Sequence, residues 1–226
     1  MKKIVLIDKR ADENIEKNLK KFGYKVLKTC ENKNIPFPLN THPDILVHKF
    51  PDGSLIVDRD NYDYYCEIFP ERKVIKASKS FGSTYRDYVS LNCLSFANYF
   101  IHNLELTDEI ILNYYKRHGY TLINVNQGYT KCNLALGSNF LITSDMGIYK
   151  KLKDITNIYL IEKGFIELKN YNYGFIGGAT GQVLDKFFIS GPYKDHPSKE
   201  ILEKFKPQVL SEKLVDYGGI LDMCVF

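Results

Sequence analysis

The sequence predicts an α/β propeller with five-fold pseudo-symmetry, built from strand–strand–helix–strand units in a single domain over residues 1–226. Three observations lead to this prediction. A strand–helix–strand pattern recurs five times, a further strand candidate accompanies the copies, and the two ends of the chain complement each other as parts of one unit. With 44% apolar residues, the chain is able to bury a substantial core.

The recurring pattern consists of a short apolar strand, a polar turn, an amphipathic helix and a second strand. Its copies begin about 41 to 50 residues apart along the chain. They cover residues 3–28, 54–76, 99–125, 140–162 and 187–212. Five matches at a nearly constant spacing indicate a repeat architecture.

A further strand candidate lies before the second to fifth copies, in the segments 43–50, 88–96, 129–136 and 174–183. The fifth candidate, GGILDMCVF at 218–226, would pair with the N-terminal strand KIVLID. We expect this pairing to close a ring of units and to cover two sheet edges that would otherwise be exposed.

Two ungapped comparisons of the chain with itself support the repeat. Sliding the sequence by 41 residues places Asn92 on Asn133, and sliding it by 47 residues places Cys132 on Ala179. The shared asparagine indicates a common structural role, such as satisfying backbone groups near the axis.

The stretch YGFIGGATG at 173–181 raises the alternative of a phosphate-binding loop. Such a loop needs its glycines between a strand and the start of a helix. The residues after Gly181 instead form another strand candidate. We therefore expect the glycines to allow close packing at the axis, and we keep Gly177 and Gly178 as positions where a ligand could approach the backbone.

Charge and cysteine usage limit the function classes. The net charge of +4 is spread along the chain without a Lys/Arg-rich run, which argues against a nucleic-acid partner. The N-terminus lacks the apolar core of a signal peptide, and no stretch approaches the ~18 apolar residues of a membrane span. The five cysteines contain no CxxC pair. We expect a cytoplasmic protein with no metal site, cofactor or membrane partner.

Five strand–strand–helix–strand units in one chain of this length resemble the pentein fold, also called the guanidino-group-modifying-enzyme fold. The segments QGYTKC and YGFIGGATG and two HP dipeptides also resemble an uncharacterised clostridial family of that fold. The superfamily includes deiminases, dimethylarginine dimethylaminohydrolases and amidinotransferases. It also includes non-enzymatic ribosome anti-association factors.

In the enzymes of that superfamily, a cysteine near the chain end attacks the guanidinium carbon. Cys224 follows a glycine pair near the end of this sequence, as in the enzymes, but at a longer gap. Cys132 lies on a strand candidate that should point toward the axis. We take Cys132 as the candidate nucleophile and Cys224 as the alternative, and either could instead be a small buried hydrophobe.

The resemblance also implies roles for a histidine and for carboxylates. His42 and Asp44 have the HxD spelling of the enzymes' acid–base histidine, although here they precede both cysteines. Asp44 and Asp216 would hold a planar cation. The remaining candidates would bind substrate around the mouth of the site: Lys131, Asn92, Gln127, Gly177, Gly178 and His196.

Three functions remain open at this point. The first is a cysteine hydrolase or transferase acting on a guanidine-type small molecule. The second is a non-catalytic module that binds a protein or ribonucleoprotein partner, as in the ribosome-associated branch. Association with a protein partner or with a second copy of the chain stays open. The third is a small-ligand binder that uses the glycine-rich segment.

Overall fold

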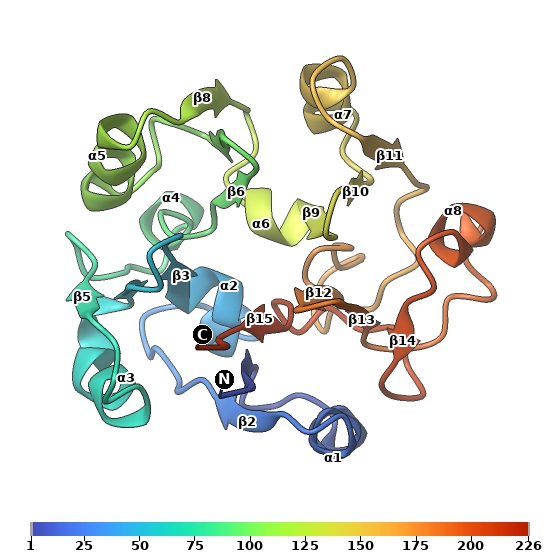
Figure 1. The fold of residues 1–226 in the computed structure, drawn as a ribbon, viewed down its shortest axis with the longest axis horizontal. Helices are drawn as coiled ribbons and strands as arrows, with labels where there is room; N and C mark the ends of the chain where they lie inside the picture. The colour runs from blue at the N-terminus through green and yellow to red at the C-terminus, as the bar shows by residue number, and fades with distance from the viewer. Residues whose placement is uncertain (1, 226) are drawn as a thin grey trace.

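The computed structural model describes residues 2–225 and contains five three-stranded sheets arranged around a common centre (Figure 1). The first strand of each sheet pairs antiparallel with the central strand, and the third pairs parallel with it. This is the strand order that the repeat predicts. The structure therefore confirms the α/β architecture of five small sheets.

The strands of the five sheets are β15 (Leu221–Asp222), β1 (Ile4–Ile7) and β2 (Lys25–Lys28); β3 (Val47–Lys49), β4 (Leu55–Val57) and β5 (Val74–Lys76); β6 (Leu94–Phe96), β7 (Tyr99–His102) and β8 (Thr121–Asn124); β9 (Leu134–Leu136), β10 (Leu141–Thr143) and β11 (Ile158–Leu160); and β12 (Thr180–Val183), β13 (Lys186–Ile189) and β14 (Gln208–Val209).

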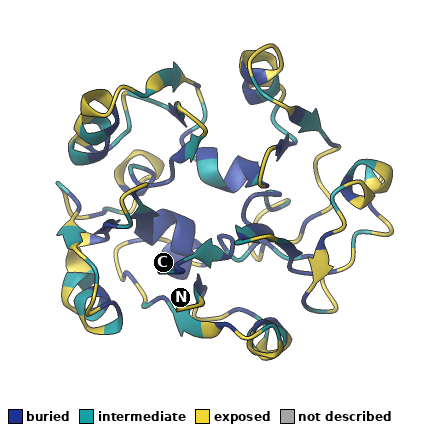
Figure 2. Cartoon of the chain, viewed as in Figure 1, coloured by how far each residue is buried: buried dark blue, intermediate teal, exposed yellow. Residues whose placement is uncertain are grey.

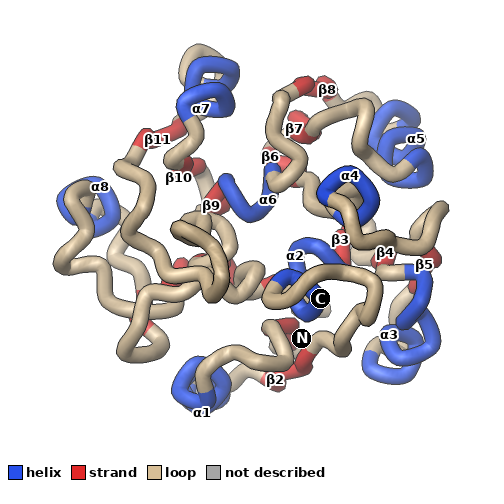
Figure 3. The backbone as a smooth tube through the Cα atoms, turned by 180° about the vertical axis from the view of Figure 1, so that it is seen from behind, coloured by secondary structure: helices blue, strands red, loops and turns tan. Residues whose placement is uncertain are grey.

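One helix links the central and third strands of each sheet. These crossover helices are α1 (Glu13–Lys21), α3 (Tyr62–Ile68), α5 (Glu109–Arg117), α7 (Met146–Leu152) and α8 (Lys199–Glu203). They lie at the periphery in both views (Figures 1 and 3) and bury one face, as their amphipathic sequences predict.

Short helical turns lie near the centre or in the connections. They are η1 (Leu39–Thr41), α2 (Pro43–Leu46), η2 (Arg59–Asn61), α4 (Tyr85–Tyr88) and α6 (Thr130–Asn133). Figure 3 shows α2 and α6 close to the middle of the molecule. Burial follows the same arrangement, because the centre is buried and the outer helices present exposed residues (Figure 2).

The two ends of the chain pair with each other. Val5 and Leu6 of β1 lie opposite Asp222 and Leu221 of β15, and a bridge joins Lys2 to Val225. The predicted pairing of the terminal strands is therefore present, and closure of the complete ring stays a prediction.

The first strands are shorter than the sequence predicts. In the segments 43–50 and 129–136, the helical turns α2 and α6 precede the strands β3 and β9. In the segment 174–183 only Thr180–Val183 is a strand, and the amide of Ala179 donates to the carbonyl of Phe175, four residues earlier. Alternation along a strand therefore does not describe Lys131 and Cys132, which share one helical turn.

The strand register confirms one repeat offset and corrects the other. Leu94 pairs with Ile101 and Ala135 pairs with Ile142, so the offset of 41 residues that joins Asn92 to Asn133 is correct. Thr143 and Ile189 occupy equivalent places, opposite Leu134 and Thr180, which gives an offset of 46. The prediction that Cys132 matches Ala179 was therefore wrong by one residue, and Cys132 matches Gly178.

The glycine-rich segment packs directly against the neighbouring unit. A Cβ atom on Gly177 would lie 2.2 Å from the carbonyl oxygen of Lys131 and 2.6 Å from that of Cys132. The amide of Gly178 donates to the Cys132 carbonyl at 3.1 Å. These contacts confirm that the glycines serve close packing, and the strand that follows them excludes the phosphate-loop reading.

No helix within residues 2–225 is both long and apolar enough to cross a bilayer.

Candidate active site

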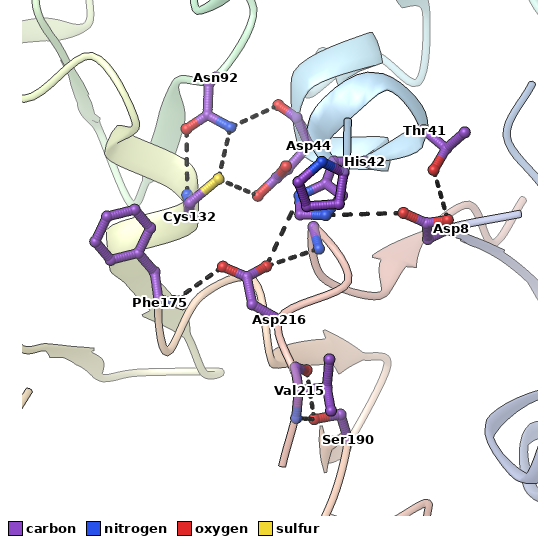
Figure 4. A network of polar contacts seen from close by, with 12 residues as sticks. Asp8, Thr41, His42, Asp44, Asn92, Cys132, Phe175, Ser190, Val215 and Asp216 are labelled. Carbon is purple, nitrogen blue, oxygen red and sulfur yellow. Dashed lines mark hydrogen bonds and ion pairs between the residues drawn. The ribbon is translucent and has the colours of Figure 1, made fainter. Parts of the chain in front are cut away.

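Cys132 lies on the turn α6 at the centre of the molecule, and its side chain is 2% exposed. Its thiol donates to Oδ2 of Asp44 at 2.9 Å, and Nδ2 of Asn92 contacts the sulfur at 3.1 Å (Figure 4). Asp44 and Asn92 come from other units of the repeat. The thiol is therefore held at a junction of three units.

Asn92 fixes this junction through both ends of its amide. Its Oδ1 accepts from the backbone amides of Lys131 at 2.9 Å and Cys132 at 3.2 Å. Its Nδ2 donates to the carbonyl of Asp44 at 3.0 Å. The predicted role of Asn92 in satisfying backbone groups is present, whereas the equivalent Asn133 bonds within its own unit, to the carbonyl of Tyr129.

His42 and Asp44 lie at the start of α2. Pro43 occupies the first helical position, where its missing amide costs no hydrogen bond, and His42 is the N-cap. The HxD spelling thus marks the entry to a helical turn. Because the backbone amide of Asp44 donates to the carbonyl of Gly218, this turn is tied to the last unit of the chain.

The His42 imidazole lies between two buried carboxylates. Its Nε2 is 3.8 Å from Oδ2 of Asp8, and its Nδ1 is 3.8 Å from Oδ1 of Asp216 (Figure 4). Both separations exceed a hydrogen bond, and Nδ1 has no hydrogen-bond partner within residues 2–225. The imidazole is thus flanked by two carboxylates, and neither of its nitrogens makes a hydrogen bond of normal length to them.

Asp216 is positioned by backbone donors and by glycines. It accepts from the amides of Phe175 and Gly218, each at 2.9 Å. Gly218 adopts φ +69°, and a Cβ atom there would lie 2.5 Å from Cβ of His42. A Cβ atom on Gly178 would lie 1.9 Å from Oδ1 of Asp216. Glycine is required at both positions for this close approach.

The carboxylates are poised to hold protons or cations. Burial raises the pKa of Asp44 to about 6, with the nearby His42 opposing the shift, and burial also raises the pKa of Asp216. Burial, followed by the carboxylates of Asp44 and Asp216, raises the pKa of the Cys132 thiol well above its usual range. The thiol is thus protonated at neutral pH until a base or a cation acts on it.

A cavity of about 230 Å³ opens beside the thiol. Cys132 and Asp216 line it together with aromatic and apolar side chains: Leu39, Tyr129, Leu168, Tyr171, Tyr173 and Phe175. A larger hollow of about 810 Å³ shares four of its residues and includes His42, Asp8 and Arg10. The sulfur and the imidazole therefore lie beside two hollows that adjoin each other.

The structure places Cys132, His42, Asp44, Asp216 and Asn92 near one another, and their roles in catalysis and binding stay predictions. Three other predicted residues lie elsewhere. Lys131 lines a different cavity, Gln127 lines a third hollow with α7 residues, and His196 binds the amide of Ser198 beside α8. His196 serves the local loop, because its Nδ1 caps this turn at 3.0 Å.

The alternative nucleophile Cys224 lies apart from this group. Its sulfur is 3.6 Å from the carbonyl oxygen of Ile4, and its side chain packs in an apolar cluster with Val5 and Phe188. Gly177 and Gly178 are also not open to a ligand, because neighbouring backbone and the Asp216 side chain fill the space beside them.

Sequence reasoning missed Asp8 and the aromatic wall. Asp8 is 1% exposed and accepts from the hydroxyl of Thr41 at 2.7 Å. Its position directly after the first central strand was the available signal, since Asp58 follows the next central strand in the same way. Tyr171 comes from an irregular segment outside the repeat pattern, and Phe175 lies in the predicted strand 174–183, which is a strand only from Thr180 onward.

Comparison with known proteins places this chain in a family. The model of a family of unknown function, DUF6873, matches residues 6–221. The chain belongs to this family. No curated protein matches it.

Solved structures match over nearly the full length of this family member. One is a dimethylarginine dimethylaminohydrolase adduct with 4-chloro-2-hydroxymethylpyridine, at 12% identity and a TM-score of 0.63, covering 95% of this chain and 93% of that chain. Another is a cysteine-to-serine variant of the enzyme from Pseudomonas aeruginosa with citrulline, at 12% identity and a TM-score of 0.60, covering 95% and 93%. This likeness establishes the pentein fold for the chain.

The described residues hold no group of three or more His, Cys, Asp or Glu side chains suited to a metal ion.

Proposed function

We propose that this protein is a cysteine-dependent hydrolase or transferase, in one domain, that acts on a small guanidine-type molecule. The observation that carries the proposal is the Cys132 thiol, bonded to Asp44 at 2.9 Å and lining the same cavity as Asp216. A nucleophile that is bonded to a proton acceptor thus lies beside a small cavity that also holds a group that attracts cations.

The cavity favours a planar cation with apolar substituents. Tyr129, Tyr171, Tyr173 and Phe175 contribute ring surfaces, and Asp216 contributes a carboxylate. Aromatic faces and a carboxylate both attract a delocalised cation such as a guanidinium. The solved structures that this chain resembles include a dimethylarginine dimethylaminohydrolase and its complex with citrulline, which supports a guanidine or ureido ligand.

The first chemical step uses Asp44. As the sulfur of Cys132 forms a bond to the guanidinium carbon, the thiol proton passes to Oδ2 of Asp44, which already accepts it as a hydrogen bond. The bound cation assists, because a positive charge beside the sulfur lowers the pKa of the thiol. The predicted cation-holding role then falls mainly on Asp216.

The second step uses His42. The bond from the guanidinium carbon to the leaving nitrogen breaks, and His42 donates a proton to the departing amine. In the hydrolase, water then attacks the carbon and gives its proton to His42 while the carbon–sulfur bond breaks. The ureido product leaves, and the thiolate of Cys132 recovers its proton from Asp44. In a transferase, an acceptor amine replaces the water.

The experiment is a product assay with a panel of guanidines: L-arginine, its N-methylated forms and agmatine. Release of ammonia or an alkylamine and formation of a ureido product are measured for the wild type and for Asp44→Asn. The proposal expects turnover of at least one guanidine and a loss of about 10²-fold or more in the variant. The proposal fails if no guanidine is consumed, or if the variant matches the wild type.

A non-catalytic ligand-binding role is the second candidate, and one observation favours it. The thiol is neutral at rest, because burial and two carboxylates raise its pKa. Saturable guanidine binding without product would support this reading. The free thiol state of all five cysteines fits a reducing compartment in either case.

A further inference from the structure

A further cavity, of about 710 Å³, has no lining residue in common with the cavity beside Cys132 or with the hollow beside His42. Residues of the helical turns α2 and α6 line this cavity, together with residues of the first strands β3, β6, β9 and β12. Two lysines and two aspartates contribute charge: Lys49, Lys131, Asp44 and Asp222. Their formal charges cancel, so a ligand without net charge matches the cavity best.

Lys131 is the unpaired cation of this lining. Lys49 lies 4.0 Å from Asp222, whereas the Lys131 ammonium has no ion pair or hydrogen bond within residues 2–225. Its side chain is half-buried, and burial lowers its pKa while the carboxylate of Asp44 opposes the shift. A half-buried ammonium without a partner is a donor site for a ligand.

Asp44 supplies the complementary acceptor. It is 1% exposed, and its Oδ2 is occupied by the thiol, but its Oδ1 has no hydrogen-bond partner among the described residues. Leaving a buried carboxylate oxygen unpaired is unfavourable. The cavity is thus lined by one residue with an unpaired acceptor and one with an unpaired donor, from two different units of the repeat.

We propose that this cavity binds an apolar α-amino acid in its zwitterionic form. The carboxylate of the ligand contacts the ammonium of Lys131, and its ammonium contacts Oδ1 of Asp44. Its side chain packs on the apolar wall, which includes Phe50, Leu91, Leu94, Phe96, Leu136 and Ile220. A zwitterion fits because it satisfies both groups and adds no net charge.

The test is titration calorimetry with the Cys132→Ser variant, so that no turnover contributes heat. L-Leucine is compared with 4-methylpentanoate, which lacks the ammonium, and with 3-methylbutylamine, which lacks the carboxylate. The proposal expects leucine to bind and each analogue to bind about tenfold more weakly or worse. It is overturned if millimolar leucine gives no binding, or if an analogue binds equally well.

A matched pair of lysine variants locates the site. Lys131→Met should weaken leucine binding by about tenfold or more, while Lys169→Met, which alters the hollow around His42, should leave it unchanged. The reverse pattern would overturn the assignment. If Lys131→Met does not fold, the comparison of leucine with its two analogues, on the chain that keeps Lys131, still decides whether a zwitterion is bound.

The tests distinguish failure of the proposed guanidine chemistry from failure of this amino-acid site. Leucine binding without guanidine turnover would refute the proposed function and leave this site intact. If agmatine, which lacks a carboxylate, displaced leucine, the ligand would lie in the thiol's cavity and this inference would be wrong.

Discussion

Cys132 and Cys224 are both buried thiols that lie beside a hydrogen-bond acceptor, yet their surroundings differ. Cys132 donates to a carboxylate, contacts an asparagine amide and lines a cavity. Cys224 lies 3.6 Å from a backbone carbonyl within an apolar cluster. Burial raises the pKa of both thiols, to about 11 for Cys224 and well above the usual range for Cys132.

The difference teaches that position in the chain is a poor guide to the reactive cysteine here. Cys224 has the more enzyme-like place after Gly218 and Gly219, but its sulfur lies beside the Ile4 carbonyl and packs in an apolar cluster. Cys132 lies in mid-chain, yet its thiol bonds to Asp44 and it lines a cavity with Asp216, because the five sheets surround a common centre. The neighbours of a thiol, and not its place in the sequence, determine its chemistry.

Cys132→Ser has the largest expected effect. If this variant kept its turnover, the contrast between the two thiols would be wrong. Removing the nucleophile should lower guanidine turnover by about 10³-fold or more, because the proposed covalent step is lost. The thermal midpoint should change little, since serine keeps the donor to Asp44. Initial rates and a melting curve check both parts. A variant that retains turnover would exclude Cys132 as the nucleophile.

Gly177→Ala tests whether the backbone around Cys132 is as tightly packed as the contacts indicate. A methyl group 2.2 Å from the Lys131 carbonyl forces the backbone to move, at a cost of roughly 2–4 kcal/mol in the free energy of unfolding. The control is Gly147→Ala in α7, where the nearest atom is the Asp145 side chain at 3.1 Å. Denaturant unfolding should separate the two variants, and equal stabilities would contradict the packing.

Asp44→Asn probes the carboxylate that distinguishes the two thiols. The folded-state pKa of about 6 lies above the usual value of 3.8, so burial of the charge destabilises the protein more as pH rises through this window. The wild type should lose roughly 1–3 kcal/mol relative to the variant between pH 4 and about 7. Turnover should rise over the same range as Asp44 ionises. Parallel pH–stability curves would contradict the shift.

Asn92→Ala sharpens the comparison at the amide that holds Cys132. The variant loses acceptors for two backbone amides and a donor to Asp44, so it should lose about 2 kcal/mol of stability and at least tenfold in turnover. Asn133→Ala, at the equivalent repeat position, should cost about 1 kcal/mol and leave turnover nearly unchanged. Equal effects on turnover would remove Asn92 as a positioning residue.

Cys224→Ala should have the smallest effect. It removes one sulfur from an apolar cluster, so we expect a loss of about 1 kcal/mol in stability and normal turnover. Loss of turnover in a folded Cys224→Ala variant would reverse the assignment of the two thiols.

The repeat could be predicted from the sequence because each unit carries its own apolar periodicity and its own turn. The match of Asn92 with Asn133 even gave the correct offset of 41 residues between two units. The helical turns α2 and α6 could not be predicted, because a short apolar run at a buried position is compatible with either helix or strand.

The candidate site was predictable only in part, for a related reason. His42, Asp44, Cys132 and Asp216 are chemically suited residue types, so the family resemblance could select them. Their pairing depends on which turns meet at the axis, as when Asn92 bridges Asp44 and Cys132. Tyr171 lies outside the repeat pattern, and Phe175 lies in a predicted strand whose first residues are irregular in the structure, so the direction of neither side chain could be predicted.

The most direct test of the central claim compares two alkylating reagents of nearly equal shape, the cation 2-chloroacetamidine and neutral 2-chloroacetamide. Peptide mass spectrometry measures modification of each cysteine. The rates at half-buried Cys30 and Cys66 serve as the reference for the intrinsic difference in reactivity between the two reagents. The account predicts that the cation modifies Cys132 at least about tenfold faster than the neutral reagent, because Asp216 and the aromatic wall concentrate it beside the sulfur. Cys132 unmodified by both reagents, or Cys224 modified in its place, would contradict it.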